Sequence, residues 1–214
     1  MGLFQGRIIS VSGIDGSGKT TIIENLTAEL EQAGVSTSYV WLRYNHYLTK
    51  ILLVFCRLIG LTVYENFEGG RVGYHNFYKS KIISYLFIWL TWIDTLIATL
   101  VTVYFPVMMG KTVVCDRWIA DILIDLHLDT HLPVNKSGFA FKAFYSLIPK
   151  SALILMVDRS FDAIYQAREE HAYDKHLEKR FQCYQQLRDS GLCRVIDNTK
   201  SMDFTIEQVR EVLQ

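Results

Sequence analysis

A glycine-rich segment near the N-terminus combines residue types that suit phosphate binding. Residues 13–21 read Gly-Ile-Asp-Gly-Ser-Gly-Lys-Thr-Thr and match the pattern G-x-x-x-x-G-K-[ST]. Its glycines let backbone N–H groups turn around phosphate oxygens, and a helix that begins there adds the positive end of its dipole. Lys19 would reach the β- and γ-phosphates of ATP, and the Thr20 hydroxyl would bind Mg²⁺. The residues expected to hold the nucleotide are Gly13, Gly16, Ser17, Gly18, Lys19, Thr20 and Thr21.

Three charged residues that follow apolar runs are candidates for the acceptor half of a phosphoryl-transfer site. Asp116 and Arg117 follow the run at residues 112–115, and Arg43 follows the run at residues 37–42. In parallel sheets, ligands bind beyond the carboxyl ends of the strands. Asp116 would hold Mg²⁺ there through water, while Arg117 and Arg43 would clamp an acceptor phosphate. The competing interpretations are an ion pair at a strand end and a surface charge, and for the glycine-rich segment a turn with a solvated lysine.

Five short runs rich in β-branched residues are expected to be the buried strands that position these groups. They are Arg7–Val11, Thr37–Leu42, Thr112–Cys115, Leu153–Val157 and Arg194–Ile196. Helical patterns follow at Thr20–Gln32, Ile82–Met109, Phe161–Ser190 and Ile206–Leu213. Strands that alternate with helices indicate an α/β fold, in which a five-stranded parallel sheet carries helices on both faces. Without a repeat or a linker, residues 1–214 are expected to form one domain.

The chain resembles the thymidylate kinases among the P-loop nucleoside-monophosphate kinases, on motifs spread over nearly its whole length. The matching segments are the glycine-rich loop with its acid at Asp15, the Asp-Arg-aromatic motif Asp116-Arg117-Trp118, the arginine after the second strand at Arg43, and the C-terminal strand Val195-Ile196-Asp197. The resemblance implies a three-layer P-loop NTPase fold and the ATP- and Mg²⁺-dependent phosphorylation of a nucleoside monophosphate, with dTMP as the first choice. It also implies catalytic roles for Lys19, Arg117 and Asp15, with Asp15 on the acceptor's sugar.

A lid over ATP is a further implication of the resemblance, at about residues 159–180. Members of the family with no arginine in the phosphate-binding loop take one from the lid, and Ser17 fills that loop position here. Arg168 is therefore the first candidate for a catalytic lid arginine, with Arg159, Lys175 and Arg180 as alternatives. The competing interpretation is a solvated helix whose charges pair at i,i+4 spacing.

The region before the third strand differs from the thymidylate kinases. In the family, a helix there carries an arginine that reads thymine, whereas residues 85–94 contain no arginine. Asp94 is then a candidate for a polar contact with the acceptor, and Tyr44 for stacking on a base. Two alternatives to a nucleotide kinase stay open. One is a kinase of a sugar or isoprenoid phosphate, and the other is a nucleotide-binding switch protein with little turnover.

Apolar residues gather within residues 44–110, which are expected to form an acceptor and dimer region. In the Ile82–Met109 helix, small polar residues lie along one side and Asp94 is the only formal charge. A helix that is apolar nearly all round must be buried, so a homodimer through this helix is the favoured interpretation. Two others are a membrane hairpin of Leu48–Val63 with Ile82–Met109, and an apolar wall around a lipid-like acceptor. Lys50 and Arg57 would lie inside the first pass of the hairpin, which disfavours it.

Composition excludes several classes of protein. The 214 residues include 22 basic and 22 acidic side chains, and this zero net charge argues against nucleic-acid binding. The 12 Phe, 12 Tyr and only 3 Pro exclude a disordered chain. The four cysteines show no Cys-x-x-Cys spacing and are expected to be free thiols. Residues 1–7 have no basic stretch before an apolar run, so a cytoplasmic location is expected.

Overall fold

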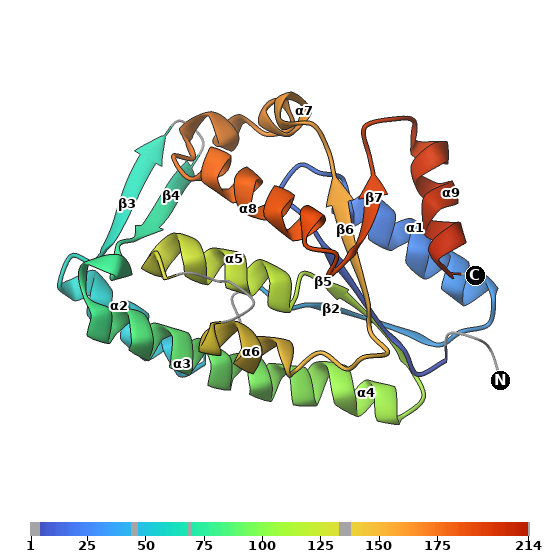
Figure 1. The fold of residues 1–214 in the computed structure, drawn as a ribbon, viewed down its shortest axis with the longest axis horizontal. Helices are drawn as coiled ribbons and strands as arrows, with labels where there is room; N and C mark the ends of the chain where they lie inside the picture. The colour runs from blue at the N-terminus through green and yellow to red at the C-terminus, as the bar shows by residue number, and fades with distance from the viewer. Residues whose placement is uncertain (1–4, 44–46, 68–69, 133–137, 214) are drawn as a thin grey trace.

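Five strands pair in parallel to form the central sheet of the protein (Figure 1). The structure is a computed structural model that describes residues 5–43, 47–67, 70–132 and 138–213. The sheet order is β2-β5-β1-β6-β7. The strands are β1 (Ile8–Ser12), β2 (Thr37–Trp41), β5 (Thr112–Asp116), β6 (Leu153–Asp158) and β7 (Arg194–Asp197). All five correspond to the apolar runs, so the predicted α/β fold with a five-stranded parallel sheet is confirmed.

Alternating side chains of the strands pack against helices on the two faces of the sheet. Ile9, Val11 and Val114 belong to a buried cluster with α1 (Lys19–Gln32) and α9 (Met202–Leu213). Ile8 and Val113, which point the other way, belong to a cluster with α3 (Lys81–Thr99) and α5 (Ile119–Thr130). Met156 of β6 joins a third cluster with α5, α7 (Phe161–Gln166) and α8 (Leu177–Asp189). The result is the expected three-layer arrangement.

The register of the sheet brings the carboxyl ends of its central strands together. Val11 of β1 lies opposite Asp116 of β5, and Trp41 of β2 lies opposite the same residue. From β1 the chain runs to β2 on one side of the sheet, and from β6 it runs to β7 on the other side. The loop after β1 therefore begins at a topological switch point of the sheet. The carboxyl ends of these strands therefore carry the glycine-rich segment, Asp116, Arg117 and Arg43.

The long apolar helix is continuous from Lys81 to Met108, as α3, a π-helical turn at Leu100–Tyr104, and α4 (Phe105–Met108). Ser80, which directly precedes the helix, caps it by accepting a hydrogen bond from the Ile83 N–H at 3.4 Å. The predicted helix Phe161–Ser190 is wrong as one element. It divides into α7, a 3₁₀ segment at Glu169–Tyr173, and α8. Tyr74 causes part of this break, because its hydroxyl donates to the Tyr173 carbonyl and accepts from the Lys175 N–H.

Several elements were not predicted from the sequence. They are α2 (Thr49–Leu58), the antiparallel hairpin of β3 (Thr62–Phe67) and β4 (Gly70–His75), a 3₁₀ turn at Phe77–Lys79, α5 and α6 (Phe139–Tyr145). The membrane hairpin of Leu48–Val63 with Ile82–Met109 is excluded, because its first half is a ten-residue helix followed by a strand. All four cysteines are free thiols, as expected, with Cys56 and Cys115 buried.

Of the described residues, only the helix Lys81–Met108 is long and apolar enough to cross a bilayer, with a mean hydropathy of 1.9 over 18 residues. Side chains along this helix are tied to the rest of the domain. Asp94 accepts hydrogen bonds from the first turn of α2, Thr99 from the Trp118 indole at 3.0 Å, and Tyr104 donates to the Leu147 carbonyl at 2.8 Å. The helix is thus one wall of the folded domain along its length.

Candidate active site

The glycine-rich loop between β1 and α1 has a backbone that requires its glycines. Gly13, Gly16 and Gly18 have φ values of 149°, 83° and 96°, which side chains disfavour. A Cβ on Gly13 would lie 2.9 Å from both the Ser17 Oγ and the Val157 carbonyl oxygen. A Cβ on Gly16 would lie 2.8 Å from the Ala167 Cβ, beyond the end of α7. The loop is therefore closely packed against its surroundings, and side chains at Gly13 and Gly16 would not fit.

Lys19 points back into this loop. Its Nζ donates to the Ile14 carbonyl oxygen at 2.8 Å, and the residue is 7% exposed. Burial and the nearby charge of Arg117 lower the pKa of Lys19 to about 7, although Asp15, Asp121 and Asp116 act in the opposite direction. A buried ammonium held by one carbonyl lacks the anionic partner that would favour its charged form. The lysine is thus poised to accept such a partner.

Two buried polar atoms beside the loop have no hydrogen-bond partner among the described residues. They are the Ser17 Oγ and the Asp116 Oδ1, while the other Asp116 oxygen accepts from the Tyr39 hydroxyl at 2.9 Å. Such groups are costly to bury without a partner. Thr20, at the start of α1, is exposed. A phosphate in the loop and a Mg²⁺ ion near Asp116 and Thr20 fit these donors and acceptors. The described residues hold no group of three or more His, Cys, Asp or Glu side chains that could bind a metal without such phosphates.

Arg117 is held at the end of β5 by a strained backbone and by several partners. Its φ of 62° is unusual for a residue with a side chain. One guanidinium nitrogen contacts the Gly13 carbonyl at 3.0 Å and the Asp121 carboxylate at 3.2 Å, and the other pairs with Asp15. The residue is 4% exposed. The positive φ turns the side chain from the strand end under the glycine-rich loop.

Asp121 of α5 is a further member of the site, not predicted from the sequence. Its carboxylate accepts from the Ser12 hydroxyl at 2.7 Å and from the Tyr184 hydroxyl of α8 at 2.6 Å, besides Arg117. The residue is 1% exposed. Burial and the charge of Asp121 raise the pKa of Tyr184 well above its usual value, so this hydroxyl stays a donor. Asp121 and Tyr184 therefore fix Arg117 in place.

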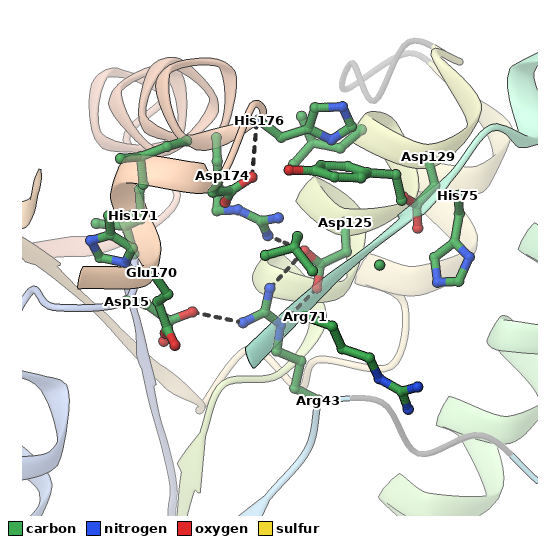
Figure 2. A pocket seen from close by; sticks show the side chains of 17 residues that line it. Asp15, Arg43, Arg71, His75, Asp125, Asp129, Glu170, His171, Asp174 and His176 are labelled. Carbon is green, nitrogen blue, oxygen red and sulfur yellow. Dashed lines mark hydrogen bonds and ion pairs between the residues drawn. The ribbon is translucent and has the colours of Figure 1, made fainter. Parts of the chain in front are cut away.

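Arg43 is held in a second group of charges next to the first. Its guanidinium makes two hydrogen bonds to Asp125 of α5, at 2.8 and 3.0 Å, and one to Asp15 at 3.1 Å (Figure 2). Arg180 of α8 also contacts Asp125, at 2.5 Å. Burial would raise the pKa of Asp15, but the charges of Arg117, Lys19 and Arg43 outweigh burial and hold it well below its usual value. Asp15 therefore stays ionised and joins the two arginines.

A cavity of about 410 Å³ opens beside these charges. Its walls come from the glycine-rich loop, the β4 strand of the unpredicted hairpin, α5, the 3₁₀ segment before α8, and α8 itself (Figure 2). Charged and imidazole groups line it, namely Asp15, Arg43, Arg71, His75, Asp125, Asp129, Glu170, His171, Asp174, His176 and Arg180. Burial and the charge of Asp125 raise the pKa of Asp129 well above its usual value. The cavity is suited to a small polar ligand next to the loop.

The predicted lid lies close to the loop. Arg159 donates to the Gly16 carbonyl at 2.7 Å, and Arg180 is held by Asp125. Arg168, the first candidate, has a half-exposed side chain that pairs with Glu170 at 2.9 Å, and its charge is one of those that lower the pKa of Asp15. Lys175 pairs with Glu65 of β3. Arg168 is thus an exposed cation paired with an exposed acid near the loop, whereas Arg159 bonds the loop backbone and Arg180 bonds Asp125.

One predicted acceptor contact, Asp94, does not join this site. Asp94 is fully buried, and its carboxylate accepts from the N–H groups of Tyr47, Leu48 and Thr49 at 3.0, 2.9 and 2.9 Å. Both oxygens are used to cap the start of α2, and Asp94 does not line the cavity. Its expected contact with the acceptor is therefore corrected to a structural role. Tyr44 lies outside the described residues.

A signal for the missed residues does exist in the sequence. Asp121, Asp125 and Asp129 follow Asp116-Arg117 at a spacing of four within an otherwise apolar stretch. Residues spaced by four lie on one face of a helix, so three acids there predict a charged stripe that needs cationic partners.

Comparisons with known proteins add no family to this site, because no family model and no curated protein matches the chain.

Proposed function

We propose that this chain transfers the γ-phosphoryl group of ATP to a nucleoside monophosphate, with Mg²⁺ as cofactor. One observation carries the proposal. Arg43 and Arg117, which follow two different strands, both pair with Asp15 of the glycine-rich loop at the wall of the 410 Å³ cavity. The loop that suits a phosphate donor and the arginines that suit a phosphate acceptor thus meet at one carboxylate. Phosphoryl transfer depends mainly on such positioning and on charge neutralisation.

Different residues of the loop would bind the phosphate oxygens of ATP and the Mg²⁺ ion. Lys19 would exchange the Ile14 carbonyl for the phosphate oxygens, and the loop N–H groups would bind the same oxygens. Thr20 and Asp116 would hold Mg²⁺, which when bound neutralises charge on the phosphates. Arg168 is the cation of the lid whose side chain is exposed and near Asp15, so it is the one proposed to reach the transferring group.

The cavity favours a polar acceptor. Its lining includes five carboxylates, three guanidiniums and three imidazoles. An isoprenoid chain would have to be buried against these groups, which costs free energy because charged groups lose water without gaining partners. A sugar and a nucleobase instead offer hydroxyl, amino and carbonyl groups to such a lining. Together with the resemblance to thymidylate kinases, this makes dTMP the first acceptor to test.

An ADP-release assay tests the proposal. The purified chain is given ATP and Mg²⁺ with dTMP, then with other nucleoside monophosphates, and finally with sugar phosphates. We expect a nucleoside monophosphate to stimulate ADP release, and Lys19→Ala to abolish turnover with every acceptor. Arg43→Lys should raise the KM for the acceptor by ~30-fold, since it loses a charged, two-pronged contact.

Arg188→Lys is the matched control for Arg43→Lys. Arg188 lies on α8 and pairs with Asp158 and Asp189 at the surface, so its replacement should leave the acceptor KM unchanged. Thermal unfolding of Arg43→Lys separates lost binding from lost folding. Tight binding of ATP with no stimulation by any acceptor would overturn the kinase proposal in favour of a nucleotide switch. Stimulation by sugar phosphates alone would overturn the acceptor class.

A further inference from the structure

The helices on one side of the domain turn apolar side chains outward. On α2, Ile51 and Leu58 are 74% and 81% exposed, and Phe55 between them is also exposed. On the long helix, Ile82, Val101 and Met108 are 79%, 62% and 85% exposed. We call the outer side of α2, the helix 81–108 and α6 the apolar face. Just over half of the exposed large apolar residues among those described belong to these three helices.

The apolar face is continuous across its three helices. The helix 81–108 packs against α2 and against α6 (Figure 1). Trp89 of α3 and Phe139 of α6 are both exposed, and their rings are 5.4 Å apart. A face of this kind on a soluble domain marks a binding surface, because monomeric proteins rarely expose large apolar patches.

The polar side of the long helix is turned inward. Ser84, Thr91, Asp94, Thr95 and Thr99 are all buried. This is the reverse of the usual surface helix, whose polar side faces water. The reversal is stabilised by specific contacts, such as the Ser84 hydroxyl to the Phe77 carbonyl at 2.9 Å and Asp94 to the α2 amides. The outward apolar side is thus built into the packing of the domain.

All exposed charges of the segments that carry the apolar face are basic. Residues 47–64, 76–111 and 138–152 contain one acid, Asp94, which is fully buried. Their basic side chains are all exposed: Lys50, Arg57, Lys79, Lys81, Lys111, Lys142 and Lys150. Because the whole chain has zero net charge, these segments carry a marked local excess of basic charge.

We propose that the apolar face binds the surface of an anionic lipid bilayer. Apolar side chains bordered by Lys and Arg, with no exposed acid, are the chemistry of helices that lie in the interface of a membrane. The helix 81–108 would lie in the membrane plane, because contacts to the domain run along its whole length. A second copy, the partner that the sequence favoured, would instead bring two basic faces together.

Vesicle flotation with the full chain tests this proposal without using its enzymatic activity. The vesicles contain either phosphatidylcholine alone or phosphatidylcholine mixed with phosphatidylglycerol. We expect binding to the anionic vesicles that weakens as salt is added. Lys81→Glu should weaken it by about fivefold or more, and Leu58→Asp by about tenfold or more. Both positions are exposed, so thermal unfolding should be unchanged.

Two matched controls lie elsewhere on the domain. Arg194→Glu on β7 reverses an exposed charge, and Tyr165→Asp on α7 replaces an exposed apolar residue. Both should bind vesicles as the unchanged chain does. Equal binding to neutral and anionic vesicles, unchanged by Lys81→Glu, would contradict the proposal. So would a failure to bind vesicles together with a dimer in sedimentation equilibrium that Leu58→Asp dissociates, which would assign the face to a second copy.

Discussion

Binding of a nucleotide should change the protonation of Lys19. In the free protein, burial and the charge of Arg117 lower its pKa to about 7, and its Nζ donates a hydrogen bond to the Ile14 carbonyl. Phosphate oxygens in the loop would place negative charge against the same nitrogen and raise this pKa. The protein should therefore take up a proton when ATP binds, at any pH between the two pKa values.

The size of the uptake follows from the pKa. At about pH 8, a group with a pKa of about 7 is protonated in roughly one tenth of the molecules, so ATP binding should take up ~0.9 proton. At about pH 6 most molecules already carry the proton, and Lys19 should contribute only ~0.1. The association constant should accordingly fall by up to ~tenfold per pH unit above pH 7, since each binding event must recruit the proton.

Calorimetry in two buffers of different ionisation enthalpy measures this uptake. ATP itself contributes little at about pH 8, because its terminal phosphate titrates near pH 6. Lys19→Met keeps the length of the side chain but cannot be protonated, so it should lose the uptake along with most of the affinity. Lys111→Met, at an exposed lysine after α4, should keep both. No uptake in the unchanged chain at pH 8, or equal uptake in Lys19→Met with measurable binding, would refute the reasoning.

Two further substitutions test groups whose roles the structure reassigns or reveals. Asp94→Ala should lower the free energy of unfolding in urea by about 3 kcal/mol, because three amides at the start of α2 lose a charged acceptor; Asp94→Asn should lose less and keep the acceptor KM, and a raised KM would restore Asp94 to the site. Asp129→Asn should raise the free energy of unfolding at about pH 8 and leave it unchanged near pH 4. The folded state of the unchanged chain binds the proton of Asp129 above the pH at which the unfolded state releases it, so its stability falls as pH rises through that window. An equal effect at both pH values would contradict this assignment.

The sheet and the glycine-rich loop were predictable because local sequence determines them. Buried parallel strands are short apolar runs, and all five appear as such at residues 8–12, 37–41, 112–116, 153–158 and 194–197. The hairpin β3–β4 was hidden, since β4 contains Gly70 and Gly73, which strands usually disfavour. A Cβ on Gly73 would lie 3.0 Å from the Tyr64 ring, so close packing across the hairpin explains that glycine.

The partners of the charged residues were less accessible to sequence reasoning. Arg43 and Arg117 could be identified because each follows a strand. Their partners lie on two different helices, and two of these partners, Asp121 and Tyr184, are more than 60 positions apart in the sequence. The break between α7 and α8 was missed for a similar reason. Tyr74, about 100 residues earlier in the chain, supplies hydrogen bonds that local propensity does not contain.

The way the arginines are paired bears on how an acceptor would enter. Arg43 and Arg117 are 7% and 4% exposed, and unpaired guanidiniums in such positions would be costly. Asp125 and Asp121 each hold one of them, and their side chains are 18% and 1% exposed. Asp15 is shared by both arginines, and its side chain is 32% exposed. A phosphate that bonded both guanidiniums would therefore displace Asp15 and leave the buried carboxylates in place, so the arginines would keep their orientation while Asp15 became free to contact the rest of the acceptor.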